Sequence, residues 1–212
     1  MYKFFPFLLL IIITTNTSAQ NWKLTTDADG MKIYMAEVAG SKIKAIKVEL
    51  ELNATQSQLV AVLMDANTCV EWVYGFKSSK LIRQVSPSES YYYAEVNLPW
   101  PAENRDYVAH LTATQNPDTK VVTIDAPAVL GFVPIKKGIV RVERSVGKWV
   151  ISPLSADKIH VVYTLQLDPG GNIPAWLVNT FATQAPTNSF KKLKEQLKKP
   201  AYRDASLPFI KD

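Results

Sequence analysis

The sequence predicts an α+β domain in which a large antiparallel β-sheet is covered by one long C-terminal helix. Three observations predict this fold. Segments that alternate apolar and polar residues recur as far as residue 167, two short helical segments interrupt them after residue 54, and one long helical segment follows the last strand. An antiparallel sheet with one apolar face needs a covering layer, and the terminal helix is the element available for it.

The composition indicates a single globular domain. The chain has 212 residues, of which 47% are hydrophobic and 20% charged, so it contains enough apolar residues to form a core. The sequence shows no internal repeat and no linker. We therefore expect one domain over residues 20–200, followed by a tail at residues 201–212.

The first residues have the pattern of a secretory signal peptide. Lys3 precedes an apolar run from Phe4 to Ile13, and Thr17-Ser18-Ala19 ends the segment with small residues. We expect residues 1–19 to be removed and the mature protein to be periplasmic or secreted. The alternative is an uncleaved anchor, but the apolar run is roughly half of the ~20 residues that span a bilayer.

The first strands of the domain follow a turn signal at Asp29-Gly30, after which Met31 to Met35 has the character of a short strand. From Ile46 to Leu52 every second residue is apolar and the residues between them are charged. This two-residue period predicts a strand with one buried face.

Two helices are predicted by capping boxes. Thr55 with Gln58, and Thr68 with Glu71, have the spacing at which a hydroxyl and an amide or carboxylate satisfy free backbone N–H groups. We expect each threonine to cap a short helix.

Strands are predicted for most of the chain from Leu81 to Leu167. Turn signals divide this region at Ser86-Pro87-Ser88, Asn116-Pro117-Asp118 and Ser155-Ala156-Asp157. The last strand, from Ile159 to Leu167, has the clearest alternation.

The final helix is expected to begin near Ile173-Pro174 and to run to about Lys199, where Pro200 stops it. Pro186 lies inside this helix. It removes one backbone hydrogen bond, so we expect a kink that lets the helix curve over the sheet.

Short motifs also occur in a consistent order along the chain. They are Trp22-Lys23-Leu24, the strand from Asp29 to Tyr34, Glu71-Trp72, Pro99-Trp100-Pro101, Asn104-Arg105-Asp106-Tyr107-Val108, Val140-Arg141-Val142, Gly147-Lys148-Trp149 and the segment from Asp168 to Asn179. This ordered set resembles the START domain, the lipid-transfer family related to steroidogenic acute regulatory protein. The resemblance implies a helix-grip fold, in which a curved antiparallel sheet wraps the C-terminal helix and encloses a hydrophobic tunnel for one lipid.

Arg105 is the first candidate site residue. It has the same strand parity as Tyr107, so its guanidinium faces the tunnel if that face is inward. A buried arginine needs a nearby carboxylate, and Glu95 in the preceding strand is the candidate partner. Two interpretations stay open: a purely structural ion pair, or a pair that also orients a lipid hydroxyl or phosphate.

The second candidate site is the segment from Leu130 to Gly138, whose apolar residues are interrupted by glycine and proline as in a loop. The resemblance implies that this loop covers the tunnel mouth beside the terminal helix, and the alternative is a loop that completes the core. The full set of predicted ligand-binding residues is Glu95, Arg105, Tyr93, Tyr107, Phe132, Val133, Ile135, Tyr163, Trp176 and Phe181.

The chain contains no nucleophile elbow, no zinc-binding His-Glu-x-x-His, no paired cysteines and no phosphate-binding glycine loop. We therefore expect no metal, no other cofactor and no enzymatic activity. Cys69, the single cysteine, has the character of a small buried residue and not of a nucleophile. The alternative is a cyclase or hydrolase of apolar substrates that uses Glu95 as a general base.

The main prediction is a protein that binds a single lipid or other hydrophobic small molecule and carries or shields it. A ligand sensor that acts through a protein partner is the alternative. Nucleic acid is not expected, because the basic residues lack interleaved aromatics. Five lysines between residues 191 and 199 either attract an anionic membrane surface, for transient contact, or form a solvated helix face.

Overall fold

The computed structural model describes residues 20–41 and 43–212. Its strands form one ten-stranded sheet in the order β1-β2-β3-β10-β9-β7-β6-β5-β4, with β8 paired to β6. All neighbouring strands are antiparallel except β6 and β8. The strands are β1 (Lys23–Ala28), β2 (Met31–Ala36), β3 (Ala45–Leu52), β4 (Phe76–Ser86), β5 (Glu89–Val96), β6 (Asn104–Gln115), β7 (Val122–Val129), β8 (Ile139–Arg141), β9 (Arg144–Ser155) and β10 (Lys158–Asp168).

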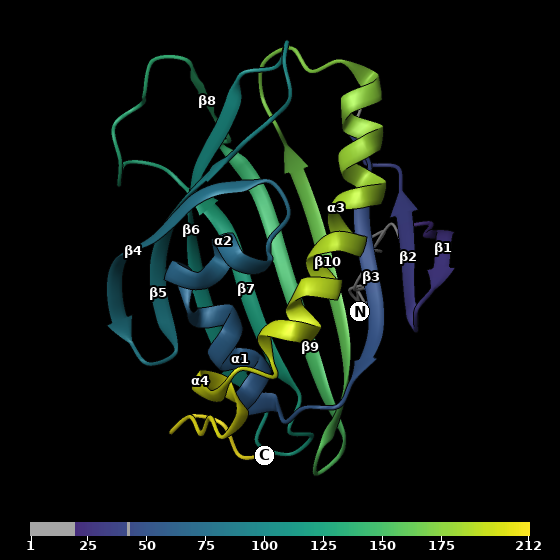
Figure 1. Ribbon diagram of the computed structural model, residues 1–212, viewed down its shortest axis with the longest axis vertical. Coiled ribbons are helices and arrows are strands. Elements are labelled where there is room, and N and C mark those ends of the chain that lie inside the picture. The colour runs from purple at the N-terminus through teal and green to yellow at the C-terminus, as the bar shows by residue number, and fades with distance from the viewer. Residues whose placement is uncertain (1–19, 42) are drawn as a thin grey trace, which may run out of the picture.

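The helices lie on one side of the sheet, and the long helix α3 crosses its face (Figure 1). They are α1 (Gln56–Met64), the 3-10 turn η1 (Ala66–Thr68), α2 (Cys69–Trp72), α3 (Ala175–Gln196) and α4 (Pro200–Arg203). The predicted α+β fold, with a large antiparallel sheet and a C-terminal helix, is confirmed.

The core forms where the alternation of β3 places its apolar residues against the helices. Val48, Leu50 and Leu52 are buried, and Val48 lies opposite Tyr163 of β10 in the sheet register. Leu193 of α3 belongs to the same buried cluster. The charged residues between the apolar positions of β3 remain on the other face, as the two-residue period predicts.

Of the two predicted capping boxes, one is formed. Thr55 accepts from the backbone N–H of Gln58, and the Gln58 side chain accepts from the backbone N–H of Thr55. The prediction for Thr68 is wrong, because its side chain makes no capping bond. Its hydroxyl donates to the carbonyl of Asp65 and lies 2.9 Å from the Tyr202 hydroxyl, so tertiary contacts replace the cap.

The terminal helix α3 begins after Pro174 and contains Pro186, as expected. Figure 1 shows that α3 changes direction partway along its length, consistent with the backbone bond that Pro186 cannot make. The helix ends at Gln196, earlier than predicted, and Pro200 begins the separate helix α4.

Residues 201–212 pack against the domain. Tyr202 and Ile210 are buried, and the Tyr202 hydroxyl donates to the carboxylate of Asp65 over 2.8 Å. The Asp212 carboxylate accepts from the backbone N–H of Ser57 over 2.9 Å. This segment therefore holds the start of α1 and the turn that precedes α2.

The predicted signal peptide at residues 1–19 lies outside the described residues. Within the described part of the chain, every helix is too short or too polar to traverse a bilayer.

Candidate functional site

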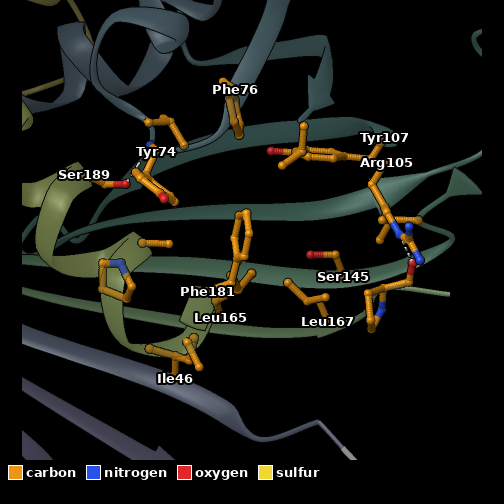
Figure 2. Close-up of a pocket in the computed structure, with 18 of the residues that line it drawn as sticks. Ile46, Tyr74, Phe76, Arg105, Tyr107, Ser145, Leu165, Leu167, Phe181 and Ser189 are labelled. Atoms are coloured by element: carbon orange, nitrogen blue, oxygen red, sulfur yellow. Dashed lines mark hydrogen bonds between the residues drawn. The ribbon is translucent and has the colours of Figure 1, made fainter. Parts of the chain in front are cut away.

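A cavity of about 380 Å³ lies between the sheet and α3. Its wall is mainly apolar and aromatic, with residues from α1, α2, α3 and eight strands, which are all the strands except β1 and β8. Figure 2 shows Phe181 of α3 projecting between Phe76 and Leu165, with Arg105 at one end of the pocket. A cavity of this kind has the size and the wall chemistry of a small-molecule site.

Arg105 of β6 brings a cationic side chain to this apolar wall. Only 4% of its surface is exposed, and it donates to three backbone carbonyls: Glu103 over 2.6 Å, Gly170 over 2.9 Å and Pro169 over 3.2 Å. Burial lowers the pKa of the guanidinium, and the charge of Glu103 partly offsets this. Arginine keeps its proton in proteins, so the group stays charged.

The turn after β10 supplies two of those carbonyls. Gly170 and Gly171 have φ angles of +64° and +61°, which glycine adopts without strain. The Asp168 carboxylate accepts from the backbone N–H of Gly170 and holds the turn. A Cβ at Gly171 would lie 3.4 Å from the Arg105 Nη2 atom, so the glycine lets the turn approach the guanidinium closely.

The predicted ion pair between Arg105 and Glu95 is wrong. In the antiparallel register Arg105 lies opposite Val96, whereas Glu95 lies opposite Asp106. Directly opposed residues share a face of the sheet, so Glu95 points away from the cavity. There its carboxylate accepts from Lys77 over 2.8 Å and from Asn104 over 3.0 Å, and these bonds lower the pKa of Glu95 despite its burial.

The same register turns Tyr93 to the outer face, where its hydroxyl accepts from Lys136 over 2.8 Å. Among the described residues, Arg105 has three carbonyl acceptors and no ion-paired carboxylate. The wall of the cavity therefore contains a buried positive charge that is stabilised by carbonyl dipoles and has no ion-paired carboxylate.

The segment from Leu130 to Gly138 does not line the cavity, which corrects the prediction for Phe132, Val133 and Ile135. Phe132 stacks on Tyr91 on the outer face of the sheet, with ring centroids 4.5 Å apart. Arg141 donates to the carbonyl of Val133, and 76% of Ile135 is exposed. This loop lies away from α3 (Figure 1).

The buried ion pair of Arg141 with Asp106 anchors the loop there, with 2.6 Å between Arg141 Nε and Asp106 Oδ1. This ion pair therefore holds the loop on the outer face of β6.

Four of the ten predicted residues line the cavity: Arg105, Tyr107, Tyr163 and Phe181. The side chain of Trp176 lies outside what the structure describes. The register of β5 excludes Tyr93 and Glu95 from the cavity, and the path of the loop excludes Phe132, Val133 and Ile135.

Comparison with known proteins identifies the family of this fold. A family model described as the START domain matches residues 14–203. The chain belongs to the START domain family. A solved structure of a STAR-related lipid transfer protein from Xanthomonas axonopodis is 35% identical and superposes with a TM-score of 0.76, covering 84% of this chain and 99% of that one.

Two sequence relatives of this START domain cover most of its length. An uncharacterised protein of Pseudomonas aeruginosa is 33% identical over 88% of this chain and 92% of its own. The phosphatidylcholine transfer protein of Mus musculus is 28% identical over 82% of both chains. The family as a whole is one of lipid binding and lipid transfer.

Several cavity residues of this START domain were not among the predictions. Tyr92 faces inward, but it lies within Tyr91-Tyr92-Tyr93, where three equal side chains give no parity signal. Trp72 and Trp149 reach the cavity from α2 and β9, and their motifs were noted without a role. Ser189 of α3 accepts from the backbone N–H of Tyr74 over 2.9 Å, a contact that joins the helix to the segment before β4.

Cys69 also lines the cavity, and burial raises the pKa of its thiol to about 12. The thiol is therefore protonated at neutral pH, which disfavours its use as a nucleophile. His110 lies on the outer face, where it contacts Glu89 over 2.8 Å and stacks on Tyr91. The geometry of these groups suits binding better than covalent chemistry.

Proposed function

We propose that this START domain binds one lipid or other hydrophobic molecule in the cavity and carries or shields it without changing it chemically. The observation that carries the proposal is the apolar cavity of about 380 Å³ between the sheet and α3, with one buried guanidinium in its wall. Each alkyl carbon moved from water into such a site contributes about 0.8 kcal/mol. The wall supplies affinity, and the polar group fixes orientation.

Arg105 is the group that orients the ligand. A guanidinium has five N–H donors, and the three bonds to carbonyls leave donors for a further acceptor. An oxyanion is the acceptor that best compensates a buried positive charge, because charge-assisted hydrogen bonds are stronger than neutral ones. The polar end of the ligand is therefore a phosphate, a carboxylate or another oxygen-rich group.

The size of the cavity favours a compact lipid. Ligand pockets span about 300–1,000 Å³, and this cavity of about 380 Å³ lies near the lower end of that range. The mouse relative named for phosphatidylcholine transfer makes a phospholipid one ligand class to test. A fatty acid shares the required chemistry, since it has an apolar chain and an anionic end.

Exchange of the ligand is proposed to occur by transient contact with a membrane, after export to the periplasm or the medium. Trp100 is 89% exposed and lies two residues after Leu98, which lines the cavity. An exposed indole suits the membrane interface. Of the lysines near the end of α3, Lys194, Lys198 and Lys199 bond to other groups of the chain, so they contribute less than Lys191 and Lys192.

Native mass spectrometry of the purified protein tests the proposal. We expect one lipid per chain, identified by extraction, and uptake of lipid from vesicles by protein that has been emptied. Ala185 lines the cavity, so Ala185→Trp should fill it and abolish copurification. Gln184→Trp, which adds the same ring at an exposed neighbouring position of α3, should keep the lipid.

An empty wild-type protein that takes up no lipid contradicts the proposal, as does an Ala185→Trp variant that retains its lipid. Recovery of a chemically altered ligand would instead indicate a cyclase or hydrolase. Binding without transfer between vesicles would indicate a sensor that needs a protein partner.

A further inference from the structure

Tyr92 of β5, Tyr107 of β6 and Tyr163 of β10 bring hydroxyl groups to the cavity wall. The hydroxyls of Tyr92 and Tyr107 lie 3.2 Å apart, so one donates to the other. In the described part of the chain, the Tyr163 hydroxyl has no hydrogen bond.

This arrangement leaves most of the donors unsatisfied. One of the three O–H groups donates in the Tyr92–Tyr107 contact, and the other two have no acceptor among the described residues. A buried donor without an acceptor costs about 1–3 kcal/mol. A hydrocarbon chain in the cavity would leave these donors without an acceptor. A ligand oxygen beside the tyrosine hydroxyls would accept from them and remove this free-energy cost.

The three tyrosines line the same cavity. Tyr163 packs on Trp149 and Phe190, with ring centroids 4.4 Å and 6.0 Å away. Burial raises the pKa of all three phenols. They therefore remain neutral and keep their protons, as hydrogen-bond donors must.

The hydroxyl cluster is distinct from the guanidinium. Figure 2 shows the ring of Tyr107 extending into the cavity with its hydroxyl directed away from Arg105. A ligand whose anionic end meets Arg105 therefore presents a different part of its body to the tyrosines. Neutral donors in an apolar wall suit a neutral acceptor, because an anion there would lack a compensating charge.

We propose that Tyr92, Tyr107 and Tyr163 form a second polar subsite that binds a neutral oxygen within the apolar body of the ligand. The ligand is then an oxygenated lipid that carries a hydroxyl, ketone or ester carbonyl in addition to its polar end. This inference rests on the proposed function, because it names the class of lipid that the same cavity takes.

Calorimetric titration with stearic acid and with hydroxystearic acids that differ only in the position of the hydroxyl tests the subsite. We expect the best hydroxystearic acid to bind about 5-fold to 10-fold tighter than stearic acid, the gain of about one net hydrogen bond. Tyr163→Phe and Tyr92→Phe keep the ring and remove the hydroxyl. Each should reduce this preference toward equal binding and leave stearic acid bound at least as tightly as in the wild type.

Tyr91→Phe is the matched control, because Tyr91 neighbours Tyr92 in β5 but lies on the outer face, stacked on His110. It should leave every affinity unchanged. Equal binding of all the acids by the wild type, or a preference that survives both cavity substitutions, would overturn the subsite and indicate that water satisfies the donors. If no fatty acid or phospholipid binds at all, the proposed function itself fails.

Discussion

Buried charged side chains have different partners on the two faces of strands β5 and β6. On the outer face, Asp106 is paired with Arg141 and Glu95 with Lys77. On the inner face, Arg105 is equally buried but has only carbonyl oxygens around it in the described chain. The Asp106–Arg141 pair holds the loop from Leu130 to Gly138 in place, and we propose that the inner charge binds the ligand.

This difference distinguishes a structural charge from a functional one. In a buried ion pair each charge already has its partner, so neither group is available to bind a charged ligand. A buried cation that is only solvated by dipoles can still gain an anionic partner. Substitutions on the two faces should therefore affect different measurements, stability on the outer face and ligand binding on the inner face.

The largest effect is expected for Asp106→Asn on the outer face. The side chains of Asp106 and Arg141 are 1% and 6% exposed, so removing one partner leaves the other buried and uncompensated. We expect a loss of about 3–5 kcal/mol in the free energy of unfolding, measured in urea.

Asp125→Asn is the matched control, because Asp125 pairs with Lys148 where both side chains are about half exposed. It should cost less than about 1 kcal/mol. If the two variants lost the same stability, the outer pair would not be the anchor described above.

The next effect is expected for Arg105→Met on the inner face. Methionine keeps the apolar stem and removes the charge. Affinity for a fatty acid or phospholipid should fall by about 10-fold to 100-fold, the range of a hydrogen bond to a charged group, while a neutral alcohol of the same chain length should bind nearly as before. Fluorescence titration with the two lipids measures this ratio.

Arg144→Met serves as the control for Arg105→Met. Arg144 pairs with Asp168 of the same turn, but its side chain is 84% exposed. This variant should not change the ratio. An equal loss of affinity for charged and neutral lipids in Arg105→Met would indicate that the arginine supports only the turn at Gly170.

The smallest effect is expected for Glu95→Gln, and it depends on pH. Bonds from Lys77 and Asn104 lower the pKa of Glu95 below its ordinary value of 4.5. A lowered pKa in the folded state means that the carboxylate contributes stability above pH 4.5, and that this contribution is lost as the pH falls through the folded pKa.

Urea unfolding at a series of pH values measures this contribution. The wild type should exceed Glu95→Gln by up to about 1 kcal/mol at neutral pH, because Lys77 is half exposed and partly screened, and the difference should vanish in acid. Lipid binding should be unchanged at neutral pH. Loss of lipid binding in Glu95→Gln would show that Glu95 belongs to the ligand site. It would contradict the assignment of outer-face charges to stability alone.

Local patterns predicted much of the fold. The alternation of β3, the capping box at Thr55 and the proline inside α3 each depend on neighbours within a few residues, and the structure has all three. The predicted capping box at Thr68 does not form, because the threonine hydroxyl contacts the hydroxyl of Tyr202, which is distant in the sequence. Sequence spacing is a reliable guide only where no tertiary contact competes for the same groups.

The sequence by itself determined the fold class, the long terminal helix and the shared face of Arg105 and Tyr107, because these follow from the periods of helices and strands. Only the tertiary structure decided which face Glu95 takes and where the loop of Phe132 lies. The register that sets Val96 opposite Arg105 comes from strand pairing, and the loop is held by Arg141 on Asp106, 35 residues away. A shift of one residue in register moves a side chain to the other face of the sheet, so strand pairing decided which charges line the cavity.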